Sequence, residues 1–230
     1  GAAVVMEGGV ELRRTATGDF RPVREAAFSR YLEQGDHWEI IEKDGRRYLL
    51  GLTAAARIAD PDNPSRVQSW LLEREEDVNG NRIDYEYDEF DGYPYLVAIR
   101  YARFVVRLSY ETRPDVVRNG RAGFARRITQ RCNAIALHLA ASDQPVRTLR
   151  LDYEQADLSD ISLLRAVQLT AHGDGQPDVA KNPLTFGYSR FDGRHIAVRW
   201  VDAAAGAAPP PPLSDHETAL LALDDLPLPG

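Results

Sequence analysis

Two groups of oxygen-donor side chains could hold a hard cation. The first lies within residues 77–84 and consists of Asp77, Asn79, Asn81 and Asp84. The second lies within residues 174–178, where Asp174 and Asp178 supply carboxylates and Gly175 favours a turn. Calcium takes carboxylate and amide oxygens, but the first group lacks the sixth-position Gly and the twelfth-position Glu of an EF-hand loop. Tight turns select the same residue types. We therefore interpret both groups as turns, with calcium binding as the alternative.

Histidine and cysteine give no sign of a transition-metal site. No two histidines have the i, i+4 spacing of a helical metal site; the five are His37, His138, His172, His195 and His216. We expect His172 to be a loop residue rather than a ligand. Cys132 is the single cysteine, so an internal disulfide is impossible and the side chain is expected to pack as a small apolar group.

Acidic side chains are abundant enough to raise the question of a hydrolase. A glycosidase needs two carboxyl groups held across a cleft, and Glu73 with Asp88 is one such pair. The solvated face of a sheet explains these acids better. The sequence also lacks a Gly-x-Ser-x-Gly elbow and a phosphate-binding Gly loop. We therefore predict no catalytic, cofactor-binding or metal-binding residue, no cofactor and no enzyme activity, with a paired-acid hydrolase as the weakest alternative.

Aromatic residues suggest a second kind of function. Trp38, Trp70 and Tyr95 are interpreted as exposed aromatics, which would suit a carbohydrate-binding or cell-surface adhesion β domain. A series of tyrosines could also stack along a sheet: Tyr85, Tyr87, Tyr93, Tyr95 and Tyr101. For this Tyr ladder we favour simple cross-strand packing over a surface that binds cargo.

Size and charge exclude several classes of partner. The chain has 230 residues, is 43% hydrophobic and carries a formal charge of -7, with an isoelectric point near 5.3. This balance argues against affinity for nucleic acid or anionic membranes, because both are polyanions. No apolar run is long enough to span a bilayer, and residues 1–9 lack the pattern of a signal peptide. We predict neither nucleic-acid binding nor direct membrane insertion.

The elements that would position these residues are strands. The dipeptide Asn79-Gly80 suits a two-residue type I′ hairpin turn between residues 66–77 and 83–88. In the second arm, Ile83, Tyr85 and Tyr87 alternate with acids, as expected of a half-buried strand. Asp44-Gly45 predicts another hairpin, and residues 7–9 a third.

Strand patterns continue along the chain. Residues 54–65 and 113–123 are predicted to be loops, because the first is rich in Asp, Asn and Pro and the second is polar. Residues 125–141 are predicted as strand, with helix as the rival. Further strands are predicted at 95–100, 104–111, 146–153, 161–171, 184–191 and 195–200. The predicted fold is all-β: an extended antiparallel meander of hairpins forming part of a curved sheet or shell wall.

Composition divides the chain into three parts. Residues 1–200 are predicted to form the β-sheet segment. Residues 201–213 are rich in Ala, Gly and Pro, which is typical of a semi-rigid linker. Residues 214–230 are interpreted as the start of a following region, with a short helix over 214–223 whose Ser214 and Glu217 are in capping-box register.

The assembled segments resemble the SpvB-type N-terminal region of the B component of bacterial Tc toxin complexes, which is related to the RHS/YD-repeat family. Gly80-x-x-x-x-Tyr85-x-Tyr87-Asp88 fits the YD-repeat core, although one extra residue precedes the closing Gly92. The framing segments that carry the resemblance are HWEIIEKDGRRYLLG at 37–51, ARIADPDNPSRVQSWLLEREEDVNGN at 56–81 and NPLTFGYSRFDG at 182–193.

The resemblance implies a structural role in a secreted toxin. In that family, β-sheets wind into a hollow shell that encloses a cytotoxic C-terminal polypeptide, and the partners are the C component and the A component of the complex. Residues 214–230 would then approach a β-propeller. Because a wall piece exposes strand edges and an apolar face, we also expect the isolated chain to oligomerise or aggregate.

Overall fold

The computed structural model describes residues 4–5, 11–24, 28–156 and 159–189. The chain divides into two units, Gly1–Ser189 and Arg190–Gly230, and only the first contains described residues. The predicted linker at 201–213, the helix at 214–223 and the strand at 195–200 therefore lie outside the described residues. Among the described residues, no helix is both long and apolar enough to cross a membrane.

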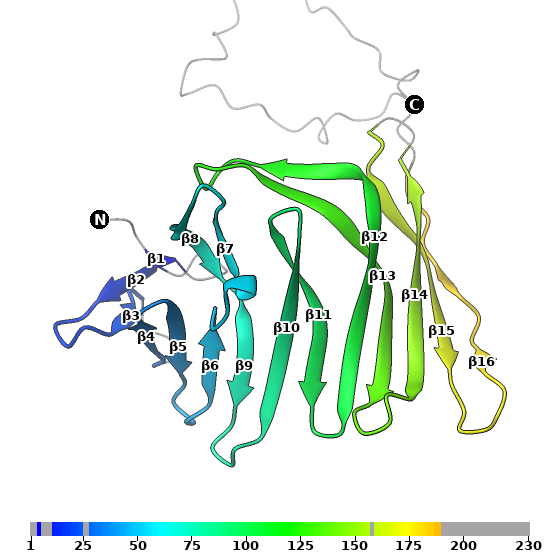
Figure 1. Ribbon diagram of the computed structural model, residues 1–230, viewed down its shortest axis with the longest axis horizontal. Coiled ribbons are helices and arrows are strands. Elements are labelled where there is room, and N and C mark those ends of the chain that lie inside the picture. Colours follow the sequence, from blue (N-terminus) through cyan, green and yellow to red (C-terminus); the bar gives the residue numbers. More distant parts are fainter. Residues whose placement is uncertain (1–3, 6–10, 25–27, 157–158, 190–230) are drawn as a thin grey trace, which may run out of the picture. The chain divides into compact units, whose positions relative to one another are not determined.

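The fold is one long antiparallel meander (Figure 1), which confirms the predicted all-β class. Within the described residues, fifteen strands form one sheet in which each strand pairs with the next along the chain, with two exceptions: β6 pairs with β9, and β17 pairs with β15 beside β16. The first strands are short: β1 (Val4–Val5), β2 (Glu11–Arg14), β3 (Phe20–Pro22), β4 (Arg30–Gln34), β5 (His37–Ile41) and β6 (Arg47–Leu50). The later ones are β9 (Leu72–Glu76), β10 (Arg82–Phe90), β11 (Tyr93–Tyr101), β12 (Phe104–Asn119), β13 (Arg126–Leu139), β14 (Pro145–Gln155), β15 (Ser162–Ala171), β16 (Val179–Ala180) and β17 (Leu184–Thr185).

The turn at Asn79-Gly80 joins β9 to β10, as predicted, but its type was predicted wrongly. The Asp77 N–H donates to the Asn81 carbonyl at 3.0 Å and the Gly80 N–H to the Asp77 carbonyl at 3.0 Å, so the loop has three residues rather than two. Gly80 has φ +81°, as required at the left-handed position of such a loop. The Asp77 carboxylate accepts from the Asn79 and Asn81 N–H groups at 2.8 and 2.9 Å, which stabilises the longer turn.

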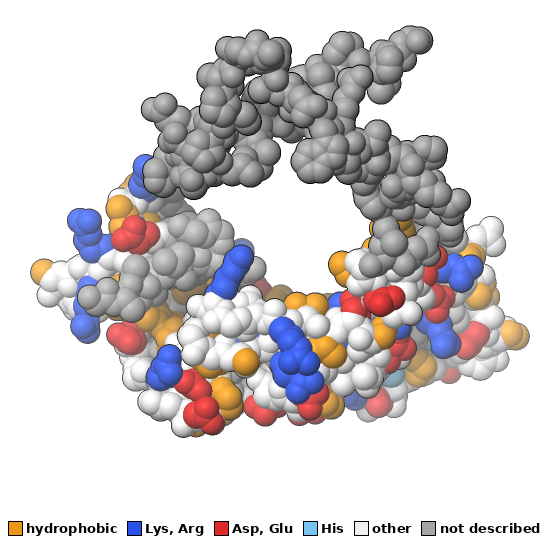
Figure 2. All heavy atoms as spheres, turned by 90° about the horizontal axis from the view of Figure 1, so that it is seen from above, with side chains coloured by type: hydrophobic (Ala, Val, Ile, Leu, Met, Phe, Trp, Pro, Cys, Tyr) orange, Lys and Arg blue, Asp and Glu red, His pale blue; other side chains and the backbone are white. Residues whose placement is uncertain are grey.

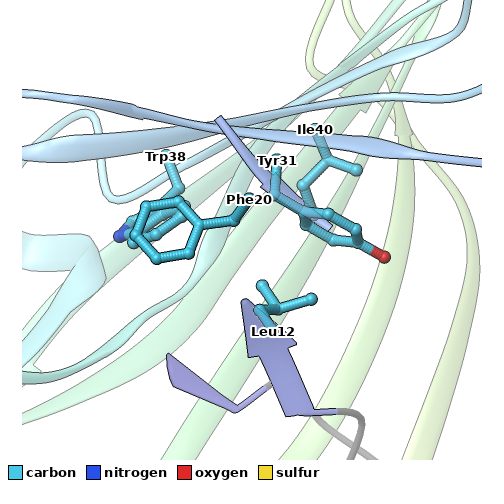
Figure 3. Packing of buried hydrophobic residues seen from close by; sticks show 5 residues of the cluster. All are labelled: Leu12, Phe20, Tyr31, Trp38 and Ile40. Carbon is cyan, nitrogen blue, oxygen red and sulfur yellow. The ribbon is translucent and has the colours of Figure 1, made fainter. Parts of the chain in front are cut away.

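The N-terminal strands enclose a hydrophobic core (Figure 3). Period-2 alternation in β2 to β5 directs five side chains into it: Leu12, Phe20, Tyr31, Trp38 and Ile40. The Trp38 ring meets Phe20 edge-on with centroids 5.1 Å apart and Trp70 at 6.0 Å. Tyr48, Leu50 and Trp70 pack against this N-terminal core.

Residues 54–65 are not the loop that we predicted. They form the 3₁₀ turn η1 (Ala54–Ala56), the strand β7 (Arg57–Asp60) and the start of β8 (Asn63–Trp70), and β7 and β8 make a separate two-stranded sheet. The turn-forming residues occupy only the tip of this hairpin. There the Asp60 carboxylate accepts from the Asp62 N–H at 3.0 Å and from Arg66 Nη1 at 2.6 Å.

The hairpin of β12 and β13 is longer than predicted. Residues 113–119, predicted as part of a polar loop, continue β12, and the turn begins only after Asn119. Residues 126–139 form a strand, which confirms the preference for strand over helix. The far end of this hairpin extends to β8, where Arg126 Nη1 donates to Gln68 Oε1 at 2.7 Å.

Pairing register gives the long hairpins one apolar and one polar face. Val106 pairs with Leu137, Leu108 with Ile135, and Ile135 with Leu149, so half-buried aliphatic side chains continue from strand to strand. The adjacent row reads Ser109, Ala134, Arg150 and Gln168 across β12 to β15. Because side chains alternate along a strand, this second row lies on the opposite, polar face.

Candidate functional site

The candidate site is an open groove of about 840 Å³ on the polar face of β12 to β15. It is lined by charged and amide side chains that come from four successive strands, namely Glu111, Arg131, Asn133, Arg150, Asp152, Arg165 and Gln168. Basic and acidic side chains are interspersed over the visible surface of the described residues (Figure 2). We refer to the open groove on β12 to β15 as the polar groove.

Two β-bulges direct side chains into the polar groove. In β13, Ser109 pairs with Ala134 and Tyr110 with Cys132, so Asn133 is the extra residue. In β15, Asp152 pairs with Ala166 and Tyr153 with Leu164, so Arg165 is the extra residue. A bulge turns its extra side chain away from the normal alternation. Both bulge residues line the polar groove.

A network of hydrogen bonds fixes one end of the polar groove. The Asp115 carboxylate accepts from Arg113 Nη2 at 2.8 Å, from the Ser162 N–H at 2.8 Å and from Ser162 Oγ at 2.5 Å. Arg131 donates to Glu111 Oε1 and to Ser162 Oγ, each at 2.7 Å. These contacts tie the bend of β12 to the start of β15, so the groove wall is held by side chains as well as by the strand ladder.

Charge and aromatic contacts explain the electrostatics of this network. The hydrogen bonds from Arg113, followed by those from Ser162, hold the pKa of Asp115 well below its usual range. Asp115 in turn raises the pKa of Arg113. The Arg131 guanidinium lies 4.5 Å from the Tyr153 ring centroid, and the Tyr153 hydroxyl donates to the Cys132 carbonyl at 2.6 Å. The Asp115 carboxylate is therefore ionised near neutral pH.

The structure corrects the prediction that three aromatic residues are exposed. Trp38 and Tyr95 are buried, with 7% and 6% of their surface accessible. Trp70 is half-buried, and its Nε1 donates to the Asp36 carbonyl at 2.9 Å. The Tyr95 hydroxyl accepts from the Thr129 and Gln130 N–H groups at 2.9 and 3.1 Å. Hydrophobic packing and these hydrogen bonds occupy the rings, so they form no sugar-binding platform.

The tyrosines do not form one continuous ladder. Tyr85 and Tyr87 reach across to β9, where they donate to Glu75 Oε1 at 2.5 Å and to the Leu72 carbonyl at 2.9 Å. Tyr93 and Tyr95 stack edge-on with centroids 5.3 Å apart, and Tyr101 lies against Phe104. Cross-strand contacts, the interpretation that we favoured, describe Tyr85, Tyr87 and Tyr101, whereas Tyr93 and Tyr95 are neighbours along β11.

The first calcium candidate is a turn. Both oxygens of Asp77 accept hydrogen bonds within the loop, and the bonds from Asn81 keep the pKa of Asp77 below its usual value. Asp84 instead pairs with Arg74 on β9 at 2.6 Å. No group of three or more His, Cys, Asp or Glu residues that could hold a metal was found in the part of the chain that the structure describes.

In the second calcium candidate, the two carboxylates have different partners: Asp178 contacts His172, and Asp174 contacts Gln144. His172 follows β15 directly, with Nδ1 2.9 Å from Asp178 Oδ2 and Nε2 2.8 Å from Thr148 Oγ1. Gln144 Nε2 donates to Asp174 Oδ1 at 3.4 Å. His172 therefore connects the segment before β16 to β14, and this role agrees with a loop residue rather than a metal ligand.

The two acids proposed for a hydrolase each have another partner. The Glu73 carboxylate accepts from the Thr53 N–H and hydroxyl, both at 2.7 Å. Asp88 accepts from the Glu89 N–H at 2.9 Å.

Cys132 is half-buried, as expected of a small apolar residue, and burial raises its pKa.

The groove residues Asn133, Arg150 and Arg165 were not singled out from the sequence. The alternation of Leu149 and Leu151 with Arg150 and Asp152 carries part of the signal, since it puts the charged pair on one face. The bulges at Asn133 and Arg165 depend on strand register, for which the sequence of a single strand gives no signal.

Comparison with known proteins confirms the resemblance stated above. Residues 19–99 match the family model described as SpvB, Salmonella virulence plasmid 65kDa B protein. The mono(ADP-ribosyl)transferase SpvB of Salmonella typhimurium is 40% identical over 52 residues, a match that covers 23% of this chain and 9% of the transferase. The match thus spans a small part of that protein.

Solved structures show the same fold. The structure of TcdB2-TccC3-Cdc42 matches with a TM-score of 0.72 at 20% identity over 84% of this chain and 13% of that chain. The N-terminal domain of effector protein SpvB from Salmonella typhimurium strain LT2 matches with a TM-score of 0.65 at 19% identity over 74% of this chain and 81% of that chain. The Photorhabdus luminescens Tc holotoxin pore matches with a TM-score of 0.67 over 81% of this chain and 12% of that chain.

Proposed function

We propose that this chain is a non-enzymatic wall segment of a secreted bacterial toxin-complex B component, which helps to enclose and deliver a cytotoxic C-terminal polypeptide. The observation that supports this function is the long antiparallel meander, which matches the TcdB2-TccC3-Cdc42 structure over 84% of this chain. A wall must keep its strands paired from end to end, because unpaired edges associate with other chains.

The proposed partners follow from the same likeness. The C component would complete the enclosure, and the A component would receive the assembled complex. The similar solved domain of SpvB is its N-terminal domain, and Glu111 and Arg131 of the polar groove pair with each other rather than forming an acid–base pair aimed at a common position. A role as wall therefore agrees with the contacts better than hydrolysis does.

Protease protection tests this function directly. The full-length B component that contains this chain is co-expressed with its C component, and digestion of the enclosed polypeptide is followed by mass spectrometry. We expect protection with the wild type. Val167→Pro should expose the polypeptide, because Val167 lies inside β15 and pairs with Leu151 and proline cannot donate to the ladder.

A matched proline substitution is the control. Val78 occupies the exposed turn before Gly80 at a position where proline is favoured, so Val78→Pro should preserve protection. Equal digestion of the polypeptide with and without the wild-type B component would rule the enclosing function out.

A further inference from the structure

The polar groove contains side chains without a full set of partners. Asn133 Oδ1 is buried and has no hydrogen-bond partner among the described residues. Buried amide oxygens are normally paired, so an unpaired acceptor that lines a groove points to a donor from outside the chain. Asn133 is also one of the two bulge residues whose side chains are turned into this groove.

Two guanidinium groups of the polar groove are available to an anion. Arg150 has 76% of its side chain exposed and only a loose ion pair with Asp152, at 3.8 Å. Arg165 is exposed and forms no ion pair within the described part of the chain. Arg131 differs from both, because it is 19% exposed and its nitrogen atoms already donate to Glu111 and Ser162. Guanidinium groups bind carboxylates through paired hydrogen bonds.

The dimensions of the polar groove indicate what kind of ligand would fit. It crosses four neighbouring strands, whose spacing of about 4.8 Å gives a width of roughly 15 Å. An extended chain rises about 3.3 Å per residue, so about four residues would cross it. β12 pairs with β13 and β14 with β15 along the groove, and β13 pairs with β14 as far as Ala134 and Arg150. We assign recognition to side chains: amides for a peptide backbone, guanidinium groups for acidic side chains.

We propose that the polar groove binds an extended polypeptide segment that carries carboxylate side chains, with Arg150 and Arg165 as the anion contacts and Asn133 as the contact to the peptide backbone. That this segment belongs to the enclosed polypeptide rests on the proposed function. The binding itself is a property of this chain and is testable without the complex.

Peptide binding to the full-length B component that contains this chain, prepared without the C component, tests the proposal. Fluorescein-labelled peptides of repeated Glu-Gly-Ser, Gln-Gly-Ser and Lys-Gly-Ser are titrated at constant ionic strength, and fluorescence anisotropy gives the affinity. The Glu peptide should bind best and the Lys peptide worst. Replacing both Arg150 and Arg165 by Gln should weaken the Glu peptide by about tenfold, as expected for lost hydrogen bonds to a charged group, and should abolish the preference for Glu over Gln.

Arg147→Gln is the matched control. Arg147 lies on the same strand as Arg150 but pairs with Leu137 and Ala171 in the apolar row, on the opposite face. Arg147→Gln removes one positive charge outside the groove, against two in the double variant, and the affinity should change by less than about twofold, as for an isolated surface charge. Asn133→Ala should weaken the Glu and Gln peptides equally, by about fivefold, because its carboxamide is assigned to the backbone.

Several results would overturn the groove assignment. These are no binding of the Glu peptide to the wild type, an equal loss with Arg147→Gln, or wild-type affinity in the double variant. Thermal unfolding confirms that each variant is folded before titration. If the double variant binds like the wild type while Val167→Pro alone exposes the polypeptide in the complex, the groove assignment fails and the enclosing function stands.

Discussion

The short N-terminal strands and the long hairpins of β12 to β15 are stabilised differently. The N-terminal core buries five side chains from four strands, including Trp38 and Phe20. In the described part of β12 to β15, by contrast, Val105 is the single buried hydrophobic residue, and the aliphatic face is half-buried. The long hairpins therefore depend on their ladders and on polar side-chain contacts, whereas the short strands depend on apolar burial.

Each region nevertheless contains a carboxylate held by several donors. Asp19 accepts from Thr17 Oγ1 at 2.8 Å and lies near Arg21 and Arg30, and the pKa of Asp19 is held well below its usual range by the hydrogen bonds from Thr15 and Thr17. Asp115 plays the corresponding role between β12 and β15. The difference between the regions thus concerns apolar packing rather than the use of charge.

The largest expected effect comes from the N-terminal core. Trp38→Ala should lower the free energy of unfolding by about 3–5 kcal/mol, because it removes a large buried ring and leaves a cavity. Leu137→Ala in the half-buried aliphatic row should lower it by less than about 2 kcal/mol. Urea denaturation of the two variants measures the difference. Equal losses would contradict the contrast between the regions.

A smaller effect is expected from the hydroxyl of Tyr95. Tyr95→Phe leaves the buried N–H of Thr129 and that of Gln130 without an acceptor, so stability should fall by about 1–3 kcal/mol. Tyr93→Phe is the matched control, because the Tyr93 ring stacks on Tyr95 and keeps its packing when the hydroxyl is removed. Hydrogen exchange of the two amides should quicken only in the Tyr95 variant.

Asp115 makes the long hairpins sensitive to acid. Because its pKa is lowered in the folded state, its contribution is present above the unfolded value of about 3.9 and is lost as pH falls below it. Asp115→Asn should destabilise the chain by about 1–2 kcal/mol near pH 7. The gap in free energy of unfolding between this variant and the wild type should narrow below about pH 4. Denaturant titrations along a pH series measure this gap. A gap that stays constant would show that ionisation of Asp115 plays no part.

Tyrosine burial gives the smallest expected effect, at alkaline pH. Burial raises the pKa of Tyr110 to about 12, and of Tyr87 to about 12 with the charge of Glu73 contributing. A raised pKa stabilises the fold below the unfolded value of about 10, and this stabilisation is lost as pH rises toward 12. Tyr110→Phe should therefore flatten the decline in melting temperature above about pH 10. An unchanged slope would contradict the assignment.

Local patterns in the sequence predicted strands better than their lengths or surroundings. The alternation around Tyr85 and the Asn79-Gly80 dipeptide located a hairpin correctly, because both signals are local. Residues 113–119 look like a polar loop because their own sequence does not show the contact that ties them to β15, where the Ser162 N–H donates to the Asp115 carboxylate. Tertiary contacts of this kind override local composition.

The same reason explains the errors at the candidate site. Trp38 and Tyr95 were placed at the surface because exposure depends on which strands cover a residue, and the amides that contact the Tyr95 hydroxyl lie more than thirty residues later. The groove depends on bulges in two strands, and one added residue reverses which face a side chain occupies. The sequence of one strand does not show in which register it pairs with its neighbour.

The order of strands in the meander has a consequence for synthesis. Each strand pairs with its predecessor from β9 to β15, so every hairpin can form on the one before it as the chain leaves the ribosome, without waiting for distant residues. The contact of Arg126 with Gln68 spans 58 residues and is a late exception. We expect the sheet to grow from the N-terminus, with the buried core around Trp38 serving as the first template and the end of the β12–β13 hairpin docking afterwards.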